Sequence, residues 1–253
     1  MVDEPTKSTA WDRTWTCVLF DLDGTIADSA QGIMAALGAA MTELDLDVPP
    51  AEELRTWVGP PPADSFRDRI GLDPAAAEHA RQTYRKHYKR IGNADIRVFD
   101  AIPHVLETLS QADIPIAVAT SKPEHTAIEV LERLNLARYF ATIAGSSEDE
   151  TISAKALIVG NALQRLRAHD IDVSRPVMVG DRVHDIVGAG KHDIPTVLVG
   201  WGYGQPSEHA QAIATVDSAS ALERILLRPG ASNPSRFGCA AQRRRGVRAA
   251  QHP

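Results

Sequence analysis

The stretch Thr-Cys-Val-Leu-Phe-Asp-Leu-Asp-Gly-Thr, residues 16–25, decides the fold. Residues 16–21 are a short apolar run that ends in an acid, and its β-branched and aromatic side chains predict a buried strand. Two carboxylates at such a strand end, Asp21 and Asp23, can converge on one cavity, where one attacks a substrate and the other exchanges protons. Gly24 permits a tight turn after them. Asp-Gly is also common turn chemistry, so this stretch alone supports a catalytic and a structural interpretation about equally.

The sequence after Phe99 alternates between helical and strand-like segments. Strands that alternate with helices pair in parallel through right-handed crossovers, so the predicted fold class is α/β with a parallel sheet. Ligands bind outside the carboxyl ends of such strands, where Asp21, Thr120 and Asp181 are expected. In chain order, the predicted elements are a helix at 102–112, a strand at 114–120, a helix at 124–135, a strand at 142–145, a helix at 153–167, a strand at 175–180, a helix at 184–192, a strand at 195–200 and a helix at 218–227.

The segment before Phe99 has a different character. Residues 49–98 contain several prolines and helical pieces but no strand-like run, and a helix is predicted to begin near Ser29. The last 25 residues contain almost no large apolar side chain, which predicts disorder. The expected organisation is a discontinuous core at 1–30 and 99–228, an all-helical insertion at 31–98 and a disordered basic tail at 229–253.

A second group of acids lies in residues 179–185, Val-Gly-Asp-Arg-Val-His-Asp. Asp181 follows a predicted strand, and Asp185 lies one helical turn later on the same face. Two more carboxylates beside the first pair would repel strongly without a cation, and hard oxygen ligands suit Mg²⁺. Asp185 could instead be a helix cap, but it falls after the predicted first turn, which favours the metal-site interpretation.

Hydroxyl and lysine side chains provide candidates for binding a phosphoryl group. Thr120 and Ser121 could donate hydrogen bonds from a strand end, although the same residue types commonly cap helices. Lys155 lies near a predicted helix start, where the helix dipole favours acids rather than bases. This misfit suggests that Lys155 binds phosphate or balances Asp21, while a solvated surface lysine is the plainer interpretation in isolation. Lys122 is an alternative for the same role.

These motifs together resemble those of a known family. Asp21-Leu-Asp-Gly-Thr, Thr120, Lys155 and Gly180-Asp-Arg-Val-His-Asp occur in the order of the four motifs of the haloacid dehalogenase superfamily. The sequence resembles its phosphatase branch, near the phosphoglycolate phosphatase-like and 5′-nucleotidase-like members, from about residue 16 to residue 227. The resemblance implies a Rossmann-like three-layer core with a small helical cap, and the helical insertion lies at the corresponding position.

The resemblance also implies the chemistry. Asp21 would attack phosphorus and become an aspartyl phosphate, while Asp23 would protonate the leaving oxygen and then activate water. The implied cofactor is Mg²⁺, bound by Asp21, the backbone carbonyl of Asp23 and Asp181, with Asp185 acting through a bound water. An acid at position 23 argues against the dehalogenases and the P-type ATPases of the same superfamily.

Substrate binding is expected from both parts of the chain. In the insertion, Arg55 and the turn that contains Gly59 are candidates for contacting the leaving group, and a structural turn is at least as good an interpretation. The candidates for binding the phosphoryl group are Gly24, Thr120, Ser121 and Lys155.

The composition argues against several other classes of protein. Of 253 residues, 43% are hydrophobic and 24% charged, and the formal net charge of −6 argues against a nucleic-acid binder. No apolar run approaches the roughly 20 residues of a membrane span. With two distant cysteines and no predicted signal peptide, we expect a cytoplasmic protein, either a monomer or a homodimer, that acts on a small-molecule phosphate ester.

Three functional hypotheses follow. The first is a Mg²⁺-dependent phosphomonoesterase for a small phosphorylated metabolite, with phosphoglycolate or a nucleoside 5′-monophosphate favoured. The second is a phosphotransferase that passes the same phosphoryl group to a sugar or protein acceptor, which the motifs do not distinguish from the first. The third is a non-catalytic regulatory protein that retains the fold; intact acids at positions 21, 23 and 181 argue against it.

Overall fold

The computed structural model describes residues 14–92, 95–100, 102–147 and 152–228. The prediction of a disordered tail at 229–253 lies outside the described residues. Within the described ranges, no helix combines the length and the apolar composition that crossing a membrane requires.

Six parallel strands form the central sheet, in the order β5-β4-β1-β6-β7-β8. The central strand β1 pairs on both sides, with Val18 opposite Ile116 and Val177. This arrangement confirms the predicted α/β class. The sequence did not predict β8, because it is only a three-residue edge strand. The strands are β1 (Cys17–Phe20), β4 (Ile116–Pro123), β5 (Thr142–Ser146), β6 (Pro176–Gly180), β7 (Thr196–Val199) and β8 (Ala214–Val216).

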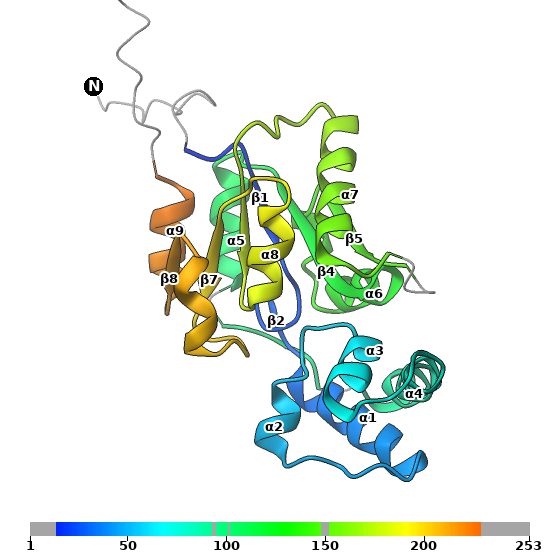
Figure 1. The fold of residues 1–253 in the computed structure, drawn as a ribbon. Coiled ribbons are helices and arrows are strands. Elements are labelled where there is room, and N and C mark those ends of the chain that lie inside the picture. Colours follow the sequence, from blue (N-terminus) through cyan, green and yellow to red (C-terminus); the bar gives the residue numbers. More distant parts are fainter. Residues whose placement is uncertain (1–13, 93–94, 101, 148–151, 229–253) are drawn as a thin grey trace, which may run out of the picture.

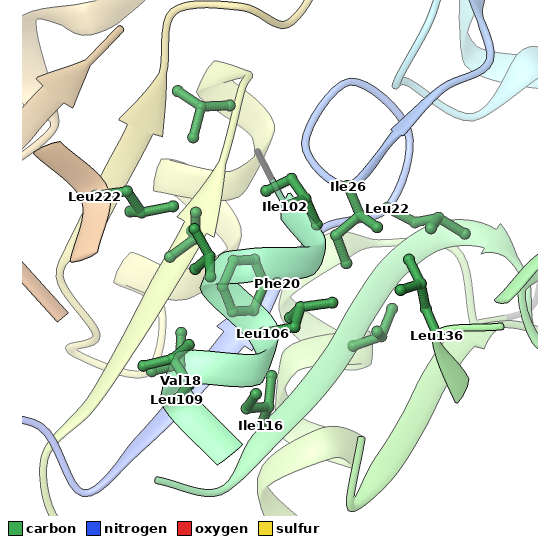
Figure 2. Packing of buried hydrophobic residues seen from close by; sticks show 14 of the residues in the cluster. Val18, Phe20, Leu22, Ile26, Ile102, Leu106, Leu109, Ile116, Leu136 and Leu222 are labelled. Atoms are coloured by element: carbon green, nitrogen blue, oxygen red, sulfur yellow. The ribbon is translucent and has the colours of Figure 1, made fainter. Parts of the chain in front are cut away.

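Helices cover both faces of the sheet, because successive side chains of a strand point to opposite faces. Val18 and Phe20 belong to one apolar cluster with α5, α6 and α9, and Figure 2 shows Phe20 beside Leu106 of α5. Cys17 and Leu19 belong to a second cluster with α7 and α8 on the other face. Burying each large side chain of these clusters contributes about 1.5–3 kcal/mol. The helices are α5 (Ile102–Gln111), α6 (Glu124–Arg133), α7 (Lys155–Ala168), α8 (Val183–Gly190) and α9 (Ala219–Leu226).

A group of helices lies at the carboxyl-terminal edge of the sheet (Figure 1). It has its own apolar cluster, in which Ile33, Leu37 and Met41 of α1 pack with Ala80 and Tyr84 of α4. We call residues 30–92 the cap. The chain enters and leaves it through the antiparallel strands β2 (Ala27–Asp28) and β3 (Arg97–Val98). The cap elements are α1 (Ala30–Glu43), α2 (Ala51–Arg55), α3 (Pro62–Ser65), α4 (Pro74–His87) and the π-helical turns η2 (Phe66–Ile70) and η3 (Tyr88–Gly92).

Several element boundaries differ from the sequence prediction by a few residues, and two of these differences bear on the site. Strand β4 continues to Pro123 rather than ending at Thr120, and its pairing with β5 jumps from Ala119 to Pro123. Helix α8 begins at Val183, one residue earlier than expected. The irregular pairing of β4 with β5 changes the direction of side chains at the rim of the sheet. The side chains between Ala119 and Pro123 therefore no longer alternate between the two faces of the sheet.

Candidate active site

Three buried aspartates meet at the carboxyl ends of neighbouring strands. Asp21 follows β1, Asp181 follows β6, and Asp185 lies in the first turn of α8. One carboxylate oxygen from each lies within 4.8 Å of those of the others. Strands β1 and β6 are neighbours in the sheet, so the fold itself places these acids together.

Lys155, the first residue of α7, lies between two of these acids. Its Nζ atom is 2.8 Å from Asp21 Oδ1 and 2.6 Å from Asp185 Oδ1. Burial alone would lower the pKa of Lys155, but the charges of Asp185 and Asp21 outweigh it and raise the pKa. The lysine is therefore a buried cation that partly neutralises the aspartates.

The remaining charge of the cluster is not balanced. Burial, opposed mainly by Lys155, raises the pKa of Asp21 to about 6. Burial, with the charges of Asp185 and Asp21 added, raises the pKa of Asp181 well above its usual range. The charged form of each group is thus disfavoured unless a further cation is bound.

The arrangement fits a hard divalent cation. Asp181 is fully buried, and its Oδ1 atom has no hydrogen-bond partner within the described residues. Its Oδ2 atom accepts a hydrogen bond from the backbone N–H of Tyr203 at 2.7 Å. An orphaned carboxylate oxygen beside two further carboxylates is the donor set that Mg²⁺ takes in proteins.

Asp185 makes two kinds of contact, and one of them is the helix cap that the sequence interpretation gave as the alternative to a metal site. Its Oδ2 atom accepts hydrogen bonds from the backbone N–H groups of Asp181 and Arg182, while its Oδ1 atom pairs with Lys155. The expectation that Asp185 falls after the first helical turn is wrong, because α8 begins at Val183. The carboxylate therefore closes the helix N-terminus and contacts the buried lysine at the same time.

Asp23 lies outside this three-aspartate cluster and lines the space between the core and the cap. Ser29 Oγ donates a hydrogen bond to Asp23 Oδ1 at 2.6 Å, and Lys122 Nζ lies 3.1 Å from Oδ1 and 2.9 Å from Oδ2. Lys122 also lies over the ring of Tyr88 in the cap, 4.9 Å from its centroid. The two lysines therefore do not compete for one role: Lys155 pairs with Asp21, and Lys122 pairs with Asp23.

The predicted phosphate-binding groups lie along the same edge of the sheet. Thr120 is buried, and its Oγ1 atom accepts a hydrogen bond from the Lys122 N–H, which leaves its own proton for another acceptor. The Gly24 N–H donates to the Ala27 carbonyl at 2.9 Å, so this donor is already engaged. What the structure does require of Gly24 is the absence of a side chain. Its φ is +86°, and a Cβ atom would collide with the Asp181 carboxylate.

A cavity of about 330 Å³ lies between the cap and the core, with Asp23 in its wall. Gly59 and Ser121, both predicted site residues, line it. Arg55 is not among the described residues that line it and instead lies over the ring of Tyr203, 5.2 Å from its centroid. A cavity of this size suits a small ligand.

Sequence reasoning missed three residues that join the cap to the site. Ser29 contacts Asp23 as described above. The Tyr203 hydroxyl accepts hydrogen bonds from the Ser29 and Ala30 N–H groups and donates to Asp28. The buried guanidinium of Arg182 donates to the Val58 carbonyl in the cap. The motifs offered no signal for Ser29. Tyr203 could have been noticed because it lies in a glycine-rich loop, and Arg182 because it lies between two site aspartates in the sequence.

Fold and site together define a class of protein. The model of the haloacid dehalogenase-like hydrolase family matches residues 18–199. The chain therefore belongs to this family, as the four motifs indicated.

The chain is also similar to several known proteins. The chain is 42% identical to the tyrosine-protein kinase PtkA of Mycobacterium tuberculosis over 188 residues, 74% of this chain and 63% of PtkA. It is 35% identical to a 5′-nucleotidase of Pseudomonas aeruginosa over 191 residues, 76% of this chain and 85% of that protein. A crystal structure of a predicted phosphatase from Clostridium acetobutylicum superposes with a TM-score of 0.78 at 34% identity, covering 83% of this chain and 97% of that chain. The chain thus spans less than two thirds of the length of PtkA.

Proposed function

We propose that the protein is a Mg²⁺-dependent phosphomonoesterase that hydrolyses a small phosphorylated metabolite through an aspartyl phosphate on Asp21. One observation carries this proposal. Asp21 lies in a buried cluster with Asp181, Asp185 and Lys155, while Asp23, two residues later, faces a cavity of ligand size. A nucleophile and a proton donor are thus two residues apart in the chain, one in the acidic cluster and one in the cavity wall. Membership of the hydrolase family supports the same activity.

The proposed reaction has two steps. In the first, the Asp21 carboxylate attacks phosphorus while the bond to the leaving oxygen breaks, and Asp23 gives that oxygen a proton. In the second, water attacks the aspartyl phosphate, Asp23 takes its proton, and inorganic phosphate and the Asp21 carboxylate are released. Lys122 engages both oxygens of Asp23, so it must shift before Asp23 can reach a leaving group.

Charge neutralisation is the other requirement of phosphoryl transfer. In this proposal Lys155, which pairs with Asp21, and the buried Thr120 hydroxyl bind the phosphoryl oxygens. A bound Mg²⁺ would be held by Asp21 and Asp181, with Asp185 nearby, and would supply Lewis-acid stabilisation of charge on the phosphoryl group.

The proposal is tested by phosphate release from a panel of esters with Mg²⁺ present. The panel contains phosphoglycolate, nucleoside 5′-monophosphates, sugar phosphates and 4-nitrophenyl phosphate. We expect Asp21→Asn to lower turnover at least about 10⁴-fold, because a carboxamide is a poor nucleophile, while the variant remains folded. Retention of full activity by Asp21→Asn would exclude the covalent mechanism.

The metal requirement has a readout of its own. Mg²⁺ should raise the melting temperature of the wild type, and it should raise that of Asp21→Asn by a smaller amount. The melting temperature of Asp181→Asn should hardly change on adding Mg²⁺, because that substitution replaces the orphaned carboxylate oxygen. EDTA should remove turnover and added Mg²⁺ should restore it. Turnover that is insensitive to EDTA would contradict the proposed metal site.

A second candidate is phosphotransfer to a protein acceptor. It is favoured by the 42% identity to a protein named as a tyrosine-protein kinase. The aspartyl phosphate would be the same, but a tyrosine hydroxyl would replace water in the second step. Isotopic label that appears on protein rather than in free phosphate would support this alternative.

A further inference from the structure

The cavity beside Asp23 is strongly basic, although the whole chain carries a net charge of −6. Among the described residues that line it, only Asp23 is acidic, and Lys122 already pairs with that residue. The basic lining residues are Arg81, Arg85, Lys86, Lys89 and Lys122.

Most of this positive charge comes from one face of the cap. Positions 81, 85 and 89 recur every four residues, so α4 and its continuation into η3 present them along one side. Arg81 forms an ion pair with Glu78. Arg85, Lys86 and Lys89 add three further positive charges to the same wall of the cavity.

Several buried donors that line the same cavity have no partner within the described residues, and two of them belong to Trp57 and Ser65. Trp57 is 2% exposed and Ser65 is 4% exposed, and both line the cavity. Neither Trp57 Nε1 nor Ser65 Oγ has a hydrogen-bond partner within the described residues. The indole is held in place by an edge contact with Phe66, at 5.8 Å between ring centroids, and by Arg69 over its ring. A buried donor without an acceptor costs about 1–3 kcal/mol, so a ligand that supplies the acceptor would recover this free energy.

We infer that this cavity binds a second anionic group of the substrate. In this arrangement Trp57 and Ser65 donate hydrogen bonds to that group, and the basic face of α4 supplies the charge. The substrate is then a phosphate monoester whose leaving group carries a carboxylate or a second phosphate. This inference rests on the proposed function, because it requires that the phosphoryl group itself bind beside Asp21.

Binding of two matched phosphonates tests the inference without turnover. Phosphonoacetate and phosphonoacetamide have the same shape, but only the first carries a negative charge at the distal end. With Mg²⁺ present, isothermal titration calorimetry should give a Kd for phosphonoacetate about tenfold or more below that for phosphonoacetamide, as expected of hydrogen bonds to a charged group. Equal affinities would overturn the inference.

Substitutions assign the preference to particular residues. Trp57→Phe and Ser65→Ala should each reduce the affinity for phosphonoacetate about three- to tenfold and change that for phosphonoacetamide less. Ser65→Ala should not destabilise the ligand-free protein, because it removes a donor that has no acceptor, whereas Trp57→Phe should cost some stability through the lost packing of the indole. A loss of stability with unchanged phosphonoacetate affinity would show that these side chains serve packing alone, against the inference.

The neighbouring residues Lys89 and Arg90 provide a matched pair for the charge. Lys89 lines the cavity, and Arg90 is exposed and is not among its described lining residues. Lys89→Gln should weaken phosphonoacetate binding several-fold and Arg90→Gln should not, although both remove one positive charge. Equal losses in the two variants would point to long-range attraction rather than a site.

Failure of the inference and failure of the proposed function are distinguishable. Hydrolysis of 4-nitrophenyl phosphate that depends on Asp21, with equal binding of the two phosphonates, would overturn the inference and leave the phosphatase activity in place. Selective phosphonoacetate binding that depends on Trp57 and Lys89, without hydrolysis of any ester, would support the anion site and count against the phosphatase.

Discussion

Lys155 and Lys122 lie in different surroundings, and the difference distinguishes the part of the site around Asp21 from the part around Asp23. Both lysines are buried, and each pairs with one aspartate of the first motif. Among the described residues, the ion-pair partners of Lys155 are Asp21 and Asp185 of the core, whereas Lys122 lies between Asp23 of the core and Tyr88 of the cap. The surroundings of Asp21 are therefore built by the core, whereas those of Asp23 also involve the cap.

The difference has a physical reason. Lys155 starts a helix that packs on the sheet, so its position follows from the core alone. Lys122 lies in the irregular end of β4, beside the cavity, and burial there depends on how close the cap lies. Removing the two charges should consequently have unequal effects on folding, which allows the comparison to be tested.

The largest effect is expected for Lys155→Met. It leaves Asp21 and Asp185 buried without their cation, which costs about 3–5 kcal/mol of unfolding free energy. Urea denaturation in EDTA measures this loss, with the exposed Lys191→Met as control. Mg²⁺ should recover part of the stability by replacing the missing charge. A loss no larger than that of the control would contradict a central role for the ion pairs.

An intermediate effect is expected for Asp21→Asn, and it depends on pH. Burial raises the pKa of Asp21 to about 6 from 3.8, so between these values the folded protein holds a proton that the unfolded chain has released. Wild-type stability in EDTA should therefore fall as pH rises from about 4 to about 6, by on the order of 2–3 kcal/mol from this group.

The variant isolates this contribution. Asp21→Asn cannot ionise, and Lys155 keeps its contact with Asp185, so the variant should be more stable than the wild type at pH 7 and about equal to it at pH 4. Urea denaturation at both pH values measures the difference. A variant that is less stable than the wild type at pH 7 would mean that Lys155 compensates the Asp21 charge fully.

The smallest effect is expected for Lys122→Met. Asp23 keeps its hydrogen bond from Ser29 and lines a cavity that water can enter, so the loss of stability should be about 1–2 kcal/mol. Turnover should fall more than this suggests, because the contact between the core and Tyr88 of the cap is lost as well. If Lys122→Met lowers the unfolding free energy as much as Lys155→Met does, the two lysines contribute equally to folding and the comparison fails.

The sequence anticipated the core half of the site better than the cap half. Asp21 and Asp181 follow apolar strands, and strand ends of a parallel sheet lie at one edge, so their convergence could be predicted from pattern alone. Arg55 was one candidate for contacting the leaving group, and its position over Tyr203 could not be predicted, because the orientation of a short cap helix depends on packing that spacing does not reveal. The partners of Lys122 were equally hidden, since Asp23 and Tyr88 lie 99 and 34 residues away along the chain.

What the sequence by itself determined is the α/β core, the position of the helical insertion and the order of the acids, because apolar periodicity and strand-end position are local properties. What only the tertiary structure decided is which charges meet. The pairing of Lys155 with Asp21 and of Lys122 with Asp23, the dual contacts of Asp185 and the basic cavity under α4 all join segments distant in sequence. Such contacts depend on the order of the strands and on the position of the cap relative to the core. Once the charged groups are buried there, leaving one of them unpaired would cost too much free energy.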